Sequence, residues 1–399
     1  MKYAIWFVRL VFAAWMIPAG INHFVPIFPQ PMGNQPLSME MIRALIDSGL
    51  FDLVKAVELI AGVGVLLGFY TPLMLLICLP VSFNVFYWDA PLEGWGSGAS
   101  RYGYATLFCN LVLCLAWFKD YRQQFALRAM VEKHKQLVVI GRLLFGAWML
   151  LAGANYLFLS LWPVPTSTDA LATQLMDALV HSRLLDVAMV LQLIGGALLL
   201  AGLYTPAVLS LLMPLTTCAL YWALVLDQQP LNLLLGVAAF ALNGLLMLAH
   251  LPYYSDCLKR YTRSAGETAG ESGSFDALLV NPTGRTAQAP YLTAMACVLL
   301  ATGFFAYFVP GRTSQFCMLM LVYPTFVLLA RRLRDMGMAA ALVLLPLALT
   351  LIAYAIKLAY LSLGASFDGM ATWIALAVTA VFVVWGSVGG SKEAKAATN

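Results

Sequence analysis

The sequence predicts an all-α, polytopic membrane protein with about twelve transmembrane helices in three four-helix bundles, the first two of which form a parallel internal repeat. Of the 399 residues, 62% are hydrophobic and only 11% are charged, whereas an average soluble domain is roughly 25% charged. Apolar segments close to the roughly 20 residues that span a bilayer recur along the whole chain. The stretch RLVFAAWMIPAGIN at 9–22 returns as RLLFGAWMLLAGAN at 142–155, which marks a duplicated module.

Twelve apolar segments are long enough to be transmembrane helices, and each copy of the repeat contains four of them. The first segment follows Lys2 and looks like a secretory signal. Its twin lies inside the chain, so we expect the first segment to be a retained helix. The segments are centred on 4–25, 51–69, 73–89, 103–118, 137–158, 185–203, 207–226, 232–251, 289–309, 314–330, 339–361 and 370–387.

The two copies stay in register along their whole length. Asn22 matches Asn155 at a separation of 133 residues, and Tyr70 matches Tyr204 at a separation of 134. Four helices per copy is an even number, so both copies enter the membrane from the same side, and we expect a pseudo-two-fold axis along the membrane normal. Because a duplicated gene often replaces a homodimer, we expect the second copy to be the pseudo-dimer partner of the first.

The distribution of basic residues predicts the orientation in the membrane. With alternating helices, one side receives both termini and most of the Lys and Arg residues outside the apolar segments. The other side receives only Arg43, Arg101, Arg183 and Arg312. Cytoplasmic loops are enriched in Lys and Arg, so we predict a multi-pass protein of the cytoplasmic (inner) membrane with both termini cytoplasmic. This distribution explains the net charge of +4 without a nucleic-acid partner, and the lipid bilayer is the first expected partner.

Three domains and a linker follow from the repeat. The start of the linker, RSAGETAGESGS at 263–274, is small, polar and glycine-rich, which suits a flexible tether. In the first copy, an amphipathic pattern from Leu37 predicts a short helix that lies in the membrane interface. Seven cysteines are scattered without metal-ligand spacing, so we predict no metal site. The predicted divisions are 1–128 (first module), 135–262 (second module), 263–288 (linker) and 289–390 (third four-helix membrane domain).

Charged residues inside the second apolar segment form the first candidate site. Asp52, Lys55 and Glu58 follow one another at three-residue spacing and share one broad helical face. A charge at mid-depth costs at least roughly 2.5 kcal/mol, so Glu58 needs a partner, a proton or a polar cavity. The second copy has Met189 and Gln192 at the positions of the lysine and the glutamate. Two interpretations stay open: a structural Lys–Glu pair, or a ligand or proton site.

Further polar residues near the ends of the first and third segments complete this candidate site. His23 stands where the second copy has Tyr156. It is either an interfacial anchor or, with the glutamate of the second segment, part of a titratable pair that the second copy lacks. A Tyr–Trp pair at the end of the third segment is also typical of an aromatic belt at the membrane border. The predicted ligand-binding residues are Glu58, His23, Lys55, Asn84, Tyr87 and Asp89.

The repeated module resembles the DoxX family of four-helix membrane proteins, over about 1–128 and 135–262. The resemblance rests on an arginine that opens the first helix, the AGxN that ends it, the second-helix sequence ELIAGVGVLLGFYTP and an aromatic end of the third helix. Members usually have a lysine after the glycine of the first helix, where this chain has Asn22–His23 and Asn155–Tyr156. The resemblance implies a link to redox systems, because the family name comes from a subunit associated with thiosulfate-to-quinone electron transfer.

The third domain resembles domain-of-unknown-function family 805. The carrying motifs are NPTGRTAQAPYLTAM, which opens the domain, and RRLRDMG at 331–337. The family typically has RRLHD-x-G, so Arg334 replaces the histidine. Two interpretations of the basic cluster stay open: an anionic lipid head-group site, or the positive-inside rule alone. Its residues are Arg331, Arg332, Arg334 and Asp335.

These features favour a binding or accessory subunit for a hydrophobic small molecule such as a quinone or a lipid, in a redox-linked system with a redox partner protein. The sequence has no haem, flavin, iron–sulfur or thiol–disulfide motif, so no built-in cofactor is expected. A transporter or flippase is one alternative, although no span is interrupted at corresponding positions of the two copies. A membrane scaffold without a small-molecule site is the other alternative. Whether the protein is an enzyme is left open.

Overall fold

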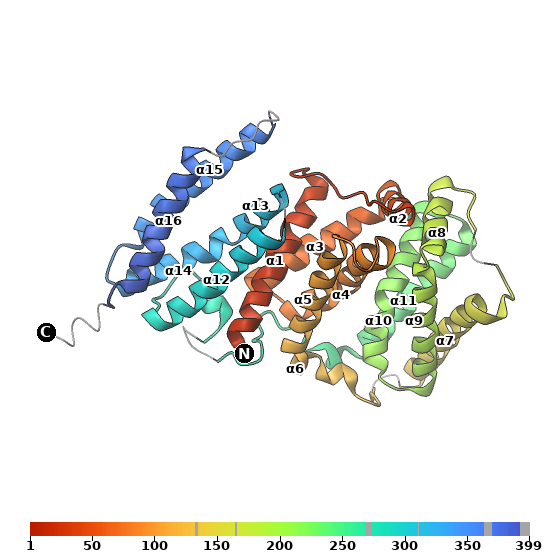
Figure 1. Cartoon of the computed structure of the whole chain (residues 1–399). Coiled ribbons are helices and arrows are strands. Elements are labelled where there is room, and N and C mark those ends of the chain that lie inside the picture. Colours follow the sequence, from red (N-terminus) through yellow and green to blue (C-terminus); the bar gives the residue numbers. More distant parts are fainter. Residues whose placement is uncertain (132–134, 164–165, 269–272, 310, 363–368, 392–399) are drawn as a thin grey trace. The chain divides into compact units, whose positions relative to one another are not determined.

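The computed structural model describes residues 1–131, 135–163, 166–268, 273–309, 311–362 and 369–391. Every regular element in these residues is a helix (Figure 1), which confirms the all-α class. The α-helices are α1 (Lys2–Phe24), α2 (Pro36–Asp47), α3 (Leu50–Leu67), α4 (Thr71–Tyr87), α5 (Ser100–Ala116), α6 (Phe118–Tyr121), α7 (Lys135–Ala154), α8 (Ala170–His181), α9 (Leu184–Ala201), α10 (Thr205–Tyr221), α11 (Pro230–Ala249), α12 (Gln288–Phe308), α13 (Gly311–Met320), α14 (Val322–Asp335), α15 (Leu344–Ser362) and α16 (Met370–Val388).

The helices have the length and composition of a polytopic membrane protein. Among the described residues, ten are long and apolar enough to cross a membrane. A further candidate is α5 together with Phe118–Phe125, which are bent by 74° relative to each other. Helix α3 is not among these ten; its 18 residues include the charged Asp52, Lys55 and Glu58. The twelve-helix count and the three-bundle arrangement stay predictions.

The chain divides into two compact units. The first unit comprises Met1–Pro18, Gly62–Phe69 and Tyr261–Asn399, and the second comprises Ala19–Ala61 and Tyr70–Arg260. Helices α1 and α3 therefore contribute residues to both units. This division differs from the sequence modules, whose boundaries stay predictions.

In the second unit, glycines set the crossing of the first two long helices of each copy. A Cβ on Gly20 of α1 would lie 2.8 Å from the Cβ of Leu59 and 2.9 Å from the carbonyl oxygen of Lys55 in α3. The second copy repeats this crossing, because a Cβ on Gly153 would lie 2.6 Å from the carbonyl oxygen of Met189. Small residues allow such close approach where no hydrophobic effect drives helix association.

The two copies contact each other through reciprocal hydrogen bonds. The Tyr87 hydroxyl of the first copy donates to the carbonyl of Ser182 in the second at 2.7 Å. The Tyr221 hydroxyl, at the equivalent position of the second copy, donates to the carbonyl of Ser48 in the first at 2.8 Å. Because equivalent residues exchange places, these contacts follow a pseudo-two-fold axis.

Backbone contacts repeat this exchange near the other ends of the helices. The Tyr70 amide of the first copy donates to the Arg260 carbonyl of the second at 2.8 Å. The Tyr204 amide of the second copy donates to the Leu127 carbonyl of the first at 3.1 Å. An interface with the same partners on both sides is the arrangement expected of a homodimer whose two genes have been joined.

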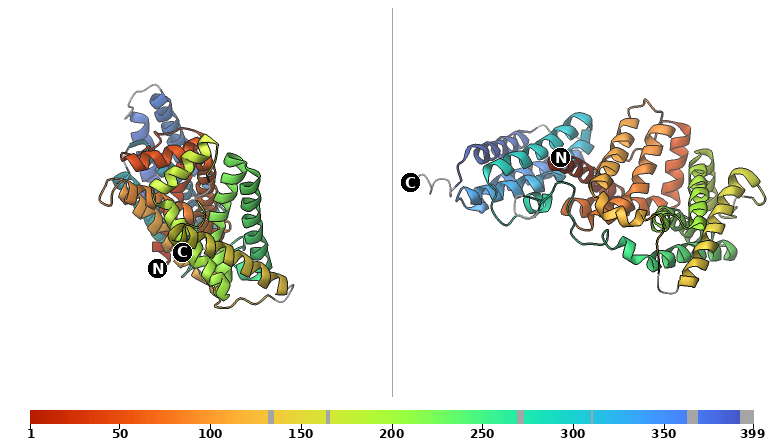
Figure 2. Two further views of the ribbon diagram at one scale, coloured as in Figure 1. Left: turned by 90° about the vertical axis from the view of Figure 1, so that its right-hand side faces the viewer. Right: turned by 90° about the horizontal axis from the view of Figure 1, so that it is seen from below.

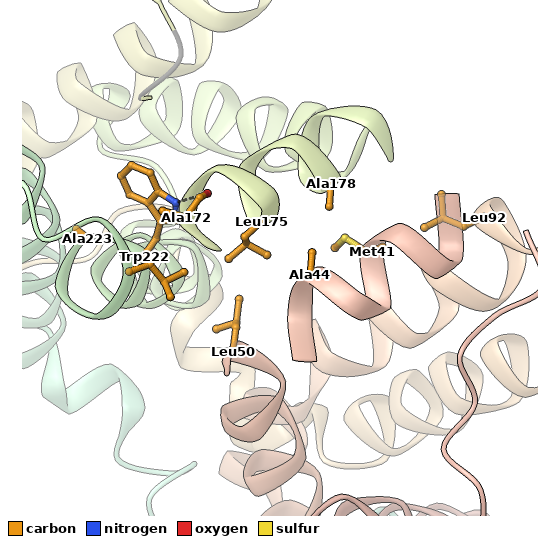
Figure 3. Packing of buried hydrophobic residues seen from close by; sticks show 10 residues of the cluster. Met41, Ala44, Leu50, Leu92, Ala172, Leu175, Ala178, Trp222 and Ala223 are labelled. Atoms are coloured by element: carbon orange, nitrogen blue, oxygen red, sulfur yellow. Dashed lines mark hydrogen bonds between the residues drawn. The ribbon is translucent and has the colours of Figure 1, made fainter. Parts of the chain in front are cut away.

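The short helices α2 and α8 pack against each other at this pseudo-dimer interface (Figure 3). Met41 and Ala44 of α2 face Leu175 and Ala178 of α8 in one buried apolar cluster. Trp222 closes the cluster, and its indole donates to the Ala172 carbonyl at 3.1 Å. The short helix predicted from Leu37 is therefore confirmed as a helix, whereas its placement in the membrane interface stays a prediction; Met41 and Ala44 of its apolar face are covered by protein.

In the first unit, the C-terminal helices lie beside one another. Helices α15 and α16 form an adjacent pair in Figure 1 and in both views of Figure 2. Helix α14 contacts α12, α13 and α16. The buried side chains of α12 include Tyr291 and Phe305, so this helix is central to the C-terminal part of the unit.

The described part of the predicted tether is not free chain. Glu267 accepts hydrogen bonds from the indole of Trp6 at 2.7 Å, from the Ser264 amide at 2.7 Å and from the Phe275 amide at 2.8 Å. Phe275 and Leu278 are fully buried. The prediction of a flexible tether over 263–274 is thus wrong for the described residues around Glu267, because this carboxylate binds Trp6 of α1. Residues 269–272 lie outside the described part of the chain.

Candidate functional site

The centre of the candidate site is a buried ion pair within α3. Lys55 Nζ donates to Glu58 Oε2 at 2.8 Å, and only 9% of Lys55 and 1% of Glu58 are exposed. The ammonium group also lies 4.8 Å from the centroid of the Phe51 ring, in a cation–π geometry. Both charges therefore point into the protein, and each has a partner.

Polar side chains from α4 and α5 lie in the same interior. Asn110 Nδ2 donates to Ser82 Oγ at 2.9 Å, and Cys114 Sγ lies 3.3 Å from Asn110 Oδ1. Cys78, one turn before Ser82, is close enough to Glu58 for an electrostatic interaction. Three helices of the first copy thus bring polar groups to one region.

Asp89 belongs to this region as well. It lies in η1 (Trp88–Leu92), the wide helical turn after α4, and is only 6% exposed. Its carboxylate interacts electrostatically with Lys55. Gly103 of α5 makes room for it, because a Cβ at Gly103 would lie 2.7 Å from the Cβ of Asp89. The structure therefore pairs Lys55 with Glu58 and buries Asp89 within electrostatic range of Lys55, and the shared binding site stays a prediction.

The second copy has no charged residue at these positions. Its apolar cluster around Leu212 includes Phe145, Leu209 and Leu246. The amide–hydroxyl pair recurs, because Asn243 Nδ2 donates to Thr216 Oγ1 at 3.3 Å, so the copies differ in the buried charges and not in polarity altogether. The replacements are Met189, Gln192, Ala223 and Leu212, for Lys55, Glu58, Asp89 and Cys78 in that order.

His23 lies beside the start of α3. Its Nε2 is 2.6 Å from Asp52 Oδ1, and its ring meets the Phe51 ring edge-on at 5.0 Å. The Phe51 ring is therefore a neighbour of both the histidine and the ammonium of the buried ion pair. In the second copy, Tyr156 donates to Asp186 at 2.8 Å. The first copy thus has a histidine–carboxylate pair where the second has a tyrosine–carboxylate pair.

The remaining predicted residues of α4 lie elsewhere. Asn84 is exposed on the helix. The Tyr87 hydroxyl binds the Ser182 carbonyl, and the indole of Trp88 donates to the Ser38 carbonyl at 2.9 Å. The aromatic-belt interpretation missed these bonds. The recurrence of Tyr–Trp in the second copy was the available signal, because a residue pair kept in both copies indicates shared packing.

Sequence reasoning also missed Glu93. Its carboxylate accepts from the amide and side chain of Asn34 at 2.7 and 3.0 Å, from the Gln35 amide at 3.3 Å and from the Ser38 hydroxyl. Burial alone would raise the pKa of Glu93, but these hydrogen bonds hold the pKa below its ordinary value. The carboxylate thereby fixes the start of α2. An acidic residue at the same position of the second copy, Asp227, was the available signal.

The arginines of the RRLRD motif bind the chain itself. Arg331 is 2% exposed, and its guanidinium donates to the Thr286 hydroxyl at 2.8 Å and to the Arg285 carbonyl at 3.1 Å. Arg334 donates to the Pro282 carbonyl. The NPTGR motif at 281–285 and the RRLRD motif at 331–335 therefore pack onto each other.

Arg332 and Asp335 tie α14 to the end of α16. Arg332 is fully buried, donates to the Gly386 carbonyl at 2.9 Å and pairs with Asp335. Asp335 also accepts from the Ser391 hydroxyl at 2.5 Å. These contacts favour a structural role for the cluster, and the lipid head-group assignment stays a prediction.

No family model, curated protein or solved structure matches the chain. The resemblances to DoxX and to family 805 therefore stay predictions. The helices themselves indicate a polytopic membrane protein, and a more specific function has to be argued from its buried charged side chains.

Proposed function

We propose that this protein is a binding or accessory subunit of the cytoplasmic membrane, and that its first module holds the polar head of a hydrophobic small molecule such as a quinone. Lys55 is the donor to an acceptor oxygen of the ligand, and Glu58 and Asp89 are acceptors for its hydroxyl groups. The resemblance to DoxX extends the proposal to a redox-linked system with a redox partner protein. Both termini lie on the cytoplasmic side, where the positive-inside rule predicts them.

The observation that carries the proposal is the difference between the copies. Burying an ion pair is costly, and its replacement by apolar residues is often neutral or stabilising. The second copy forms the same helix crossings with Met189 and Gln192 at these positions. The module therefore does not need the charges in order to fold, and a ligand that they bind explains why the first copy has them.

Native mass spectrometry of the purified full chain, with co-extracted lipids retained, tests the proposal. We expect one small molecule per chain in the wild type. Lys55→Met/Glu58→Gln removes both charges together and copies the second module, so it keeps the fold while losing the molecule. Asp186→Asn is the matched control, because it removes an acidic charge from the second copy, and we expect it to retain the molecule.

Two results would count against the proposal. The first is a wild-type protein that contains only bulk phospholipid, and the second is a double variant that retains the same molecule. Either would favour a scaffold without a small-molecule site. One observation already supports that second candidate: Lys55 and Glu58 satisfy each other at 2.8 Å.

A further inference from the structure

The arginine that opens each copy has a different environment in the two copies. In the first copy, Arg9 is 1% exposed, pairs with Asp276 at 2.8 Å and donates to the Val65 carbonyl at 2.7 Å. Its guanidinium carbon lies 3.8 Å from the centroid of the Phe275 ring. An aromatic–acidic pair in the segment before α12 therefore recognises this arginine through both its charge and its flat face.

The helix that follows this segment covers the neighbouring face of α1. The rings of Phe7 and Phe304 of α12 meet edge-on at 6.3 Å. The thiol of Cys297, about two turns before Phe304 in α12, donates to the Tyr3 carbonyl at 3.5 Å. The first copy is thus occupied by two linked elements of this chain: the Phe275–Asp276 pair and the transmembrane helix after it.

In the second copy, the equivalent residue Arg142 is only half-buried. No carboxylate of the described chain pairs with it. Its guanidinium lies against Gly202, whereas the Asp276 carboxylate lies against the equivalent Gly68 in the first copy. Burial lowers the pKa of nearby His250, and the positive charge of Arg142 lowers it further. The site therefore has positive potential without an acidic partner.

The helix surface around Arg142 is open as well. Leu10 and Val11, which follow Arg9, are 0% and 5% exposed. The equivalent Leu143 and Leu144 of α7 are 40% and 62% exposed. The sequences RLVFAAW and RLLFGAW are nearly the same, so α7 presents the same kind of surface that the first copy uses to bind α12.

We propose that the face of α7 around Arg142 is a docking surface for a partner membrane protein. The partner presents a transmembrane helix that is preceded, on the side of the membrane where 263–288 lies, by an aromatic residue and an acidic residue. Its carboxylate pairs with Arg142 as Asp276 pairs with Arg9, and its helix covers Leu143 and Leu144. A protein partner is favoured over a lipid phosphate because Arg9 of the first copy binds an aromatic ring and a carboxylate together.

A photo-crosslinking experiment on the full chain tests this surface with a defined probe. The probe is a synthetic peptide of residues 273–290 with benzoylphenylalanine in place of Phe275. The protein is held in nanodiscs of uncharged phosphatidylcholine, and crosslinked residues are identified by mass spectrometry. We expect crosslinks to α7 or to the region of Gly202. Asp276→Asn in the peptide removes the charge-assisted hydrogen bond to Arg142, so we expect it to lower the yield at least about tenfold.

Variants of the protein separate this docking from non-specific binding. We expect Arg142→Gln to lower the yield as much as the peptide change does, and Arg142→Lys to retain part of it. Arg183→Gln, which removes an exposed arginine of the same copy, leaves the yield unchanged. Crosslinks confined to α1, or a yield independent of Arg142, overturn the proposal. A third result also overturns the proposal: the peptide gives no crosslink, and native mass spectrometry finds an anionic phospholipid whose binding depends on Arg142. The surface is then a lipid site.

Discussion

Replacing Glu58 by Gln leaves the Lys55 ammonium buried without its partner. In the wild type the two charged atoms are 2.8 Å apart, and the residues are 1% and 9% exposed. At an effective dielectric constant of about 20, charges about 3 Å apart attract by about 6 kcal/mol, and desolvation offsets a large part of this energy. Breaking a buried pair typically costs about 3–5 kcal/mol, so we expect Glu58→Gln to lower the free energy of unfolding by that amount.

The double variant Lys55→Met/Glu58→Gln has a different expected outcome. Because no uncompensated charge is left, its free energy of unfolding should lie within about 1 kcal/mol of the wild type. Each single variant leaves one buried charge unpaired, so a double-mutant cycle should yield a coupling energy of at least about 5 kcal/mol. Reversible unfolding in mixed micelles, followed by tryptophan fluorescence, measures the four values.

A coupling energy below about 0.5 kcal/mol would refute the reasoning, because contacting residues that depend on each other exceed that value. Asp186→Asn provides the control for a carboxylate with an exposed partner. Its ion pair with Arg183 has side chains that are 31% and 80% exposed, at a distance of 3.2 Å. An exposed pair contributes less than about 1 kcal/mol, so the control should be close to the wild type.

Three further outcomes are expected. A hydrogen bond and the negative charge of Glu40 raise the pKa of His181 above its ordinary value. This contact between the copies therefore stabilises the fold fully below about pH 6.5, and the stabilisation is lost as the pH rises through the raised pKa. His181→Gln should remove this pH dependence from a plot of melting temperature against pH. Gly20→Ala should cost about 1–3 kcal/mol through overpacking against α3, whereas Gly244→Ala, where a Cβ meets nothing within 4 Å, should be neutral or stabilising by up to about 1 kcal/mol in the same unfolding assay. Tyr87→Phe removes one hydrogen bond between the copies and should cost about 1 kcal/mol, measured against the wild type in mixed micelles.

The internal repeat was the part of the architecture that the sequence predicted best. A constant separation between matching residues requires that the copies have the same helix order, and reciprocal contacts follow if they pair as a pseudo-dimer. The sequence did not reveal which groups make those contacts. A tyrosine at a helix end reads equally well as a membrane anchor and as a donor, and only the fold places the Ser182 carbonyl within 2.7 Å of Tyr87.

The candidate site was predicted in part, for a similar reason. Lys55 and Glu58 are three residues apart on one helix, so their pairing follows from local geometry. The burial of Asp89 depends on Gly103 of another helix, which makes room for it, and this is a tertiary effect. Asn84 is polar, as are the buried residues of the candidate site, but its position on α4 leaves it exposed. Composition therefore selected the right residue types, and helix packing decided which of them meet.

Arg9 and Arg142 show most clearly where reasoning from sequence ends. They open nearly the same helix sequence, so any local rule assigns them the same environment. One is enclosed by Phe275 and Asp276, which directly follow the segment whose composition suggested a tether, and the other is half-buried. The difference arises because the chain has one C-terminal domain for two equivalent surfaces. The duplication thus produces two equivalent arginine-bearing helix surfaces, but the chain has one Phe275–Asp276 pair to cover them. The surface around Arg142 is the one that we propose binds a partner with the same chemistry.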